Sequence, residues 1–113
     1  FYATVVGGNT NSANGGSVFI GGGRSNAANG ENAAVAGGRS NKANGESAFV
    51  GAGNLNFAAT FAVTTGGYSN SAQGEYGVVG GGALNAASNY SQNATLPRCS
   101  IRKLFTSENS SED

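Results

Sequence analysis

The feature that most constrains the fold of this chain is a repeat of about 15 residues that runs through most of its length. An asparagine recurs at steps of 15, 15, 15, 14 and 15 residues, with glycine three positions before it and alanine two positions after it. The six asparagines are Asn11, Asn26, Asn41, Asn56, Asn70 and Asn85. A short, fixed period of this kind is typical of stacked supersecondary units, so the sequence predicts a solenoid.

Each repeat contains two short stretches joined by a glycine-rich bend. Side chains two apart in a strand share a face, so Val18 and Ile20 lie on one side of the first stretch. The second stretch repeats Asn-x-Ala, and glycine recurs too often for a helix. We therefore expect an all-β fold, a parallel β-solenoid (β-roll) of about six 15-residue coils over residues 1–89. The interior should hold one branched column: Val5, Ile20, Val35, Val50 and Val79.

The turn after each second stretch is Asn-Gly in three repeats, as in Asn29-Gly30. Asn-Gly supplies a positive φ at low cost, so we expect positive φ at these turns. The fourth repeat, from Asn56 to Ala62, lacks this dipeptide and is one residue short. A bulge or irregular turn is the simpler explanation there, and a binding feature is the alternative.

Stacking places the six repeated asparagines above one another, where their amides can bond each other or backbone groups. We interpret them as a structural ladder. The alternative is that they contact a ligand or a glycan.

The outward face of the first stretch carries no charge and includes two phenylalanines. A lone solenoid would expose this stripe to water, and large contiguous apolar patches usually mark an interface. We therefore expect a subunit interface at four residues: Phe19, Phe49, Val63 and Val78.

Composition excludes several classes of function. Charged residues make up 11% of the chain and the net charge is zero, so nothing electrostatic indicates a nucleic acid or an anionic membrane as partner. No apolar run is long enough for direct membrane insertion. Without histidine or clustered thiols we expect no metal site, no cofactor and no enzymatic activity. We interpret the charged columns of the coils as solvated faces: Glu31, Glu46 and Glu75 in one, Arg24 and Arg39 in another.

The repeat stops after Ala87, and residues 90–113 form a non-repetitive tail that we expect to be irregular and partly disordered. Three N-glycosylation sequons begin at Asn89, Asn93 and Asn109. Cys99 is the only cysteine, which leaves a free thiol or an intermolecular disulfide. The basic and apolar segment 101–105 is interpreted as a capping strand or a docking peptide.

The units beginning Ser17-Val-Phe-Ile-Gly-Gly-Gly and Ser47-Ala-Phe-Val-Gly-Ala-Gly resemble the head repeats of YadA-like trimeric autotransporter adhesins. The resemblance covers about residues 1–89. It implies a left-handed parallel β-roll, a homotrimer and a role in surface adhesion. The neck, coiled-coil stalk and membrane anchor of that family have no counterpart in these 113 residues.

These observations favour a non-enzymatic, extracellular or cell-surface structural and adhesive module, either a β-roll head or a fibre subunit. Its partners would be copies of itself, in a trimer and conceivably a filament, and a host, matrix or cell-surface receptor. The main alternative is a subunit of a head-to-tail extracellular filament without an adhesin anchor. An ice-binding solenoid is disfavoured, because only Thr4, Thr64 and Thr65 fall near one face.

Overall fold

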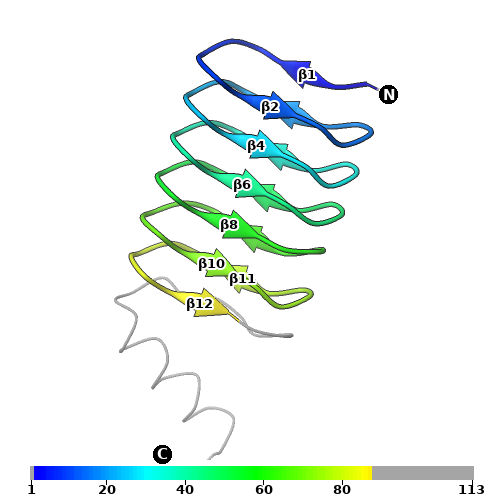
Figure 1. The fold of residues 1–113 in the computed structure, drawn as a ribbon. Coiled ribbons are helices and arrows are strands. Elements are labelled where there is room, and N and C mark those ends of the chain that lie inside the picture. The colour runs from blue at the N-terminus through cyan, green and yellow to red at the C-terminus, as the bar shows by residue number, and fades with distance from the viewer. Residues whose placement is uncertain (1, 88–113) are drawn as a thin grey trace, which may run out of the picture.

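The computed structural model describes residues 2–87, which form a single stack of coils (Figure 1). These residues contain twelve strands of two residues each and no helix. The strands of odd number are β1 (Thr4–Val5), β3 (Phe19–Ile20), β5 (Ala34–Val35), β7 (Phe49–Val50), β9 (Val63–Thr64) and β11 (Val78–Val79). The strands of even number are β2 (Ser12–Ala13), β4 (Ala27–Ala28), β6 (Lys42–Ala43), β8 (Phe57–Ala58), β10 (Ser71–Ala72) and β12 (Ala86–Ala87).

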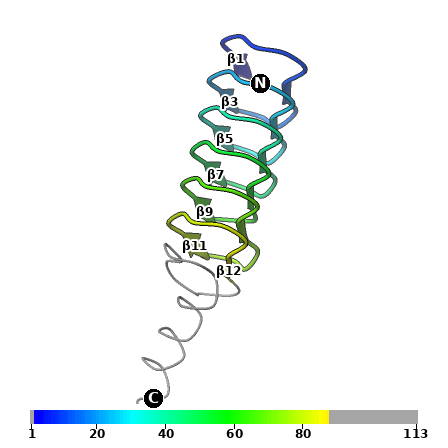
Figure 2. The ribbon, with the colours of Figure 1, turned by 90° about the vertical axis from the view of Figure 1, so that its left-hand side faces the viewer.

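The strands form two parallel six-stranded sheets, and each coil contributes one strand to each sheet. We refer to them as the odd sheet (β1-β3-β5-β7-β9-β11) and the even sheet (β2-β4-β6-β8-β10-β12). Equivalent residues of successive coils pair directly, as in Phe19 with Ala34 and Ala28 with Ala43. Seen along one edge, the coils lie above one another in a regular column (Figure 2). The all-β parallel solenoid predicted from the repeat is therefore confirmed.

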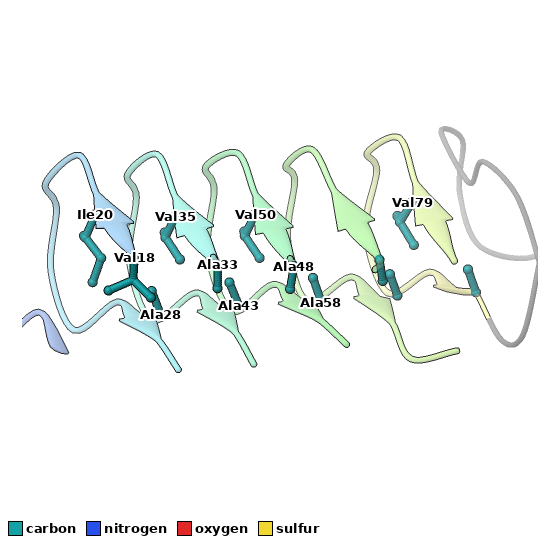
Figure 3. Packing of buried hydrophobic residues seen from close by; sticks show 13 residues of the cluster. Val18, Ile20, Ala28, Ala33, Val35, Ala43, Ala48, Val50, Ala58 and Val79 are labelled. Carbon is teal, nitrogen blue, oxygen red and sulfur yellow. The ribbon is translucent and has the colours of Figure 1, made fainter. Parts of the chain in front are cut away.

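The two sheets enclose a thin apolar interior, to which each sheet contributes a single layer of side chains. Thirteen buried apolar residues fill this interior, and every one is valine, isoleucine or alanine (Figure 3). Ile20, Val35, Val50 and Val79 are fully buried as expected, because inward positions of a strand alternate with outward ones. The expectation for Val5 is wrong, since its side chain is 43% exposed. Val5 lies in the first described coil, where only one neighbouring coil covers the interior.

The bends from the odd to the even sheet depend on glycine. The glycine three residues before each ladder asparagine has φ between 91° and 100°, a conformation that side chains rarely adopt. A Cβ on Gly23 would also overlap the carbonyl oxygen of Gly38 in the next coil. The tight bend expected at the repeated glycine is thus confirmed.

The expectation for the Asn-Gly turns is wrong in the position of the positive φ. Gly15, Gly30 and Gly45 do not lie in the positive-φ region; that conformation falls later in the turn, for example at Asn32 (62°) and Ser47 (55°). Glycine is needed at these positions for a different reason. A Cβ on Gly30 would overlap the backbone of Gly45 in the next coil, because the two backbones lie close together here.

The short fourth repeat is accommodated in its turn rather than in its strands. Strand pairing continues through it, with Val50 opposite Thr64 and Thr64 opposite Val79. Thr64 replaces a branched apolar residue in the interior and donates its hydroxyl to the Phe57 carbonyl at 2.7 Å. Phe61 takes the positive-φ position of the shortened turn and stacks on Tyr76 of the next coil, with ring centroids 5.3 Å apart.

Two glycines of one coil give a matched test of this packing. We expect Gly30→Ala to destabilise the fold by about 3 kcal/mol or more, because the added methyl group must push neighbouring backbones apart. Gly37→Ala should change stability by less than about 1 kcal/mol, since a Cβ there meets nothing within 4 Å. Urea unfolding followed by circular dichroism measures both. Equal destabilisation by the two variants would contradict the close approach at Gly30.

Candidate functional surfaces

Each ladder asparagine forms hydrogen bonds both within its own coil and to the next coil. The Asn41 side-chain amide donates to the Gly37 carbonyl of its own bend at 2.9 Å and to the Gly53 carbonyl of the next coil at 3.0 Å. Its oxygen accepts the Asn56 backbone N–H at 2.9 Å. Both amide hydrogens and the amide oxygen are therefore used within the fold.

The same arrangement recurs along the stack, so the structure brings all six predicted residues into one column. The backbone N–H of Asn26, Asn70 and Asn85 is likewise donated to the amide oxygen of the preceding rung. Five of the six asparagines are at most 2% exposed, and Asn11, in the first coil, is half-buried. The alternative that the amides bond one another does not apply to this column, because their partners are backbone groups.

A second amide ladder lies on the turns and was missed from the sequence. The Asn14 amide donates to the Asn29 oxygen at 2.8 Å, and the Asn29 amide donates to the Asn44 oxygen at 3.0 Å. The signal was the recurrence of asparagine before glycine, which we interpreted only as a turn preference. This ladder is more exposed to solvent than the first one, so its hydrogen bonds compete more directly with water.

The outward face of the odd sheet carries a continuous, largely apolar column. Thr4, Phe19, Ala34, Phe49, Val63 and Val78 pair in direct register along the sheet. Phe19 is 43% and Phe49 37% exposed, while Val63 and Val78 are half-buried. The structure thus places the four predicted interface residues side by side, on a face that no other described part of the chain covers. We refer to this column as the apolar stripe.

Two charged columns lie on the coil edges. Arg24 and Arg39 are direct neighbours in a parallel bridge on the bends. Glu31 and Glu46 occupy equivalent positions on the turns, where their carbonyls accept equivalent N–H groups of the following coil. All four residues are exposed, and within residues 2–87 none of their side chains makes an ion pair.

Within the part of the chain that the structure describes, no three acidic, cysteine or histidine side chains gather as a metal site would require. No helix in residues 2–87 has the length and apolar character needed to cross a membrane. The sequons at Asn89, Asn93 and Asn109, Cys99 and the segment 101–105 lie outside the described residues.

In comparisons with known proteins, no family model and no curated protein sequence matches this chain.

The structural role of the ladder can be tested within one coil. Asn41→Ala removes the only partner among the described residues of the Gly37 carbonyl and of the Asn56 N–H, whereas the Gly53 carbonyl still accepts the Arg39 N–H at 2.8 Å. We expect a loss of about 1–3 kcal/mol, because the two orphaned groups lie in a largely buried position. Asn44→Ala, three residues later in the exposed ladder, should cost less than about 0.5 kcal/mol. Thermal melting of both variants distinguishes the two sites. An unchanged melting temperature for Asn41→Ala would contradict the ladder.

Proposed function

We propose that this protein is a non-enzymatic structural and adhesive module of the extracellular space or the cell surface. In this proposal, copies of the β-roll associate with one another and present a broad, rigid surface for attachment. The attachment partner would be a host, matrix or cell-surface receptor.

The observation that carries this proposal is the apolar stripe of the odd sheet. Phe19 and Phe49 remain substantially exposed in the single chain although the interior beneath them is already filled. The stripe therefore contributes little to the packing of its own coil. Burying it against further copies would remove a contiguous apolar surface from water, which is the usual driving force for association.

The resemblance of the coils to YadA-like head repeats supports three copies in the assembly. It rests on the Ser-x-Phe-x-Gly pattern at Ser17 and Ser47 and on the asparagine, glycine and alanine columns. Three flat odd sheets turned inwards would enclose one apolar axis. Left-handed winding and trimeric assembly are part of the proposal on this ground.

The use of polar groups inside the fold favours a surface function over a pocket. The buried polar side chains of the described residues are Thr64 and five of the ladder asparagines. The asparagine amides donate to backbone carbonyls, and Thr64 does the same. Thr64 is also fully buried, so it cannot belong to the surface array of threonines that an ice-binding solenoid would present.

Substitution within the apolar stripe tests self-association. Phe49→Asp places a charge between Ala34 and Val63 of the adjacent strands. We expect the wild-type chain to sediment as an oligomer and the variant as a monomer, because an unpaired carboxylate would be buried in the interface. Sedimentation velocity at several protein concentrations measures this.

Phe57→Asp is the matched control, since Phe57 lies on the even sheet between Lys42 and Ser71. It should leave the oligomer intact while circular dichroism verifies the β-fold of both variants. A wild-type chain that remains monomeric at every concentration would overturn the proposed self-association. So would an oligomer that tolerates Phe49→Asp.

The filament alternative requires contact between the ends of two copies. The coil that contains β1 leaves Val5 and Val6 43% and 68% exposed. Either a preceding coil of the same chain or the end of another copy would cover these residues and pair with the open edge of β1.

Electron microscopy of the purified protein distinguishes the two arrangements. If copies stack end to end, we expect unbranched filaments, and deletion of residues 99–113 should shorten them if the segment 101–105 docks on the next copy. Discrete particles at every concentration would contradict the filament and leave the adhesive head.

A further inference from the structure

We propose that copies of this chain pair side by side, parallel and at the same height, through ion pairs between opposite edges of the β-roll. Arg24 and Arg39 of one copy would face Glu31 and Glu46 of the next. The inference rests on the self-association proposed above and adds its orientation and axial register.

The two charged columns occupy opposite edges of the solenoid. The bends that join odd to even strands run along one edge, and the turns that return to the next odd strand run along the other (Figure 1). Arg24 lies between β3 and β4, in a bend, whereas Glu31 lies between β4 and β5, in a turn. The odd sheet with its apolar stripe lies between these edges, so a copy packed against the stripe brings its own edges close to them.

The spacing of the charges along the stack matches as well. Arg24 and Arg39 are one coil apart, and so are Glu31 and Glu46, which is about 4.8 Å along a parallel sheet. Elsewhere the bend column carries no charge: its other members are Asn9, Asn54, Tyr68 and Ala83. Once one arginine lies level with one glutamate of the neighbour, the equal spacing therefore brings the second arginine level with the second glutamate.

Each column alone places like charges on adjacent coils, which is unfavourable. Within residues 2–87 no opposite charge pairs with these four side chains. An opposite column on a second copy would relieve both repulsions together. Exposed ion pairs contribute little individually, but complementary charge selects orientation and excludes wrong pairings.

Symmetry decides which arrangement benefits. Rotation about an axis parallel to the solenoid keeps all copies pointing the same way and brings the basic edge of each copy to the acidic edge of the next. This holds for two copies as well as for three. A perpendicular two-fold axis instead brings bend edge to bend edge and, with full overlap of the stacks, places the arginines opposite Asn54 and Tyr68. Parallel association alone forms the four-residue match.

The experiment uses three charge variants of the full chain. Arg24→Glu with Arg39→Glu makes all four positions acidic, and Glu31→Arg with Glu46→Arg makes all four positions basic, while Glu75 at the far end of the turn column is unchanged in every variant. The third variant carries all four substitutions, so it exchanges the edges and restores complementarity. Lys42→Glu, an exposed change on the even sheet, is the control for altered net charge.

Sedimentation velocity at low ionic strength gives the protein concentration at which half of the chain is assembled. We expect each two-residue variant to raise this concentration by about tenfold or more, because attraction at each edge becomes repulsion. The four-residue exchange should return it to within about threefold of the wild-type value, and Lys42→Glu should leave it unchanged. About 1 M salt should weaken the effect, since it screens exposed charges.

The outcomes separate this inference from the proposed function. If the wild-type chain never assembles, self-association itself is wrong. If the wild-type chain assembles and the two-residue variants assemble equally well, the edge pairing alone is wrong. Failure of the four-residue exchange to recover assembly, with its β-fold verified by circular dichroism, would also overturn the edge pairing.

Discussion

One side-chain amide per coil holds the bends of this solenoid together. The strands are only two residues long, and backbone hydrogen bonds outside them, such as the Arg24 N–H to the Gly38 carbonyl, also join successive coils. The Asn41 amide adds bonds to Gly37 in its own bend and to Gly53 and Asn56 in the next coil. Because each rung also orients the next, the bonds form a continuous buried network rather than isolated contacts. The bends, and the side chains that they carry, take their spacing from this network together with the backbone hydrogen bonds between coils.

The buried asparagine network also explains why the outer surface is the place to look for a function. The ladder asparagines form their hydrogen bonds within the fold, and the interior is filled by small apolar residues. Only the outward faces of the coils can therefore contact another molecule. Identical coils then repeat each outward position in a straight column. One column is apolar and lies on the odd sheet, and two carry opposite charges on the edges that flank it. Self-association would use all three columns in one interface.

The repeat predicted the solenoid, its register and most of its interior, because period and alternation are properties of the sequence itself. It did not predict the exposure of Val5, which depends on how many coils cover a position. The role of glycine in the Asn-Gly turns was misassigned, because a glycine can be required either for a positive φ or for close approach of two backbones. The backbone angles of these glycines and the overlap that a Cβ on Gly30 would make with Gly45 show that close approach is the reason. The columns of the candidate surfaces followed from the repeat, whereas their placement on opposite edges required the three-dimensional path of the coil.

Amide hydrogen exchange measured by NMR tests the central claim, that buried asparagine amides lock each coil to the next. The backbone N–H groups of Asn41, Asn56 and Asn70 are donated to the amide oxygen of the preceding rung. They should exchange about a hundredfold or more slowly than the Gly37 N–H, which has no such partner among the described residues. The Asn11 N–H, with no rung before it in those residues, should be much less protected than Asn41. Equal exchange rates at Asn41 and Gly37 would contradict the ladder and the account built on it.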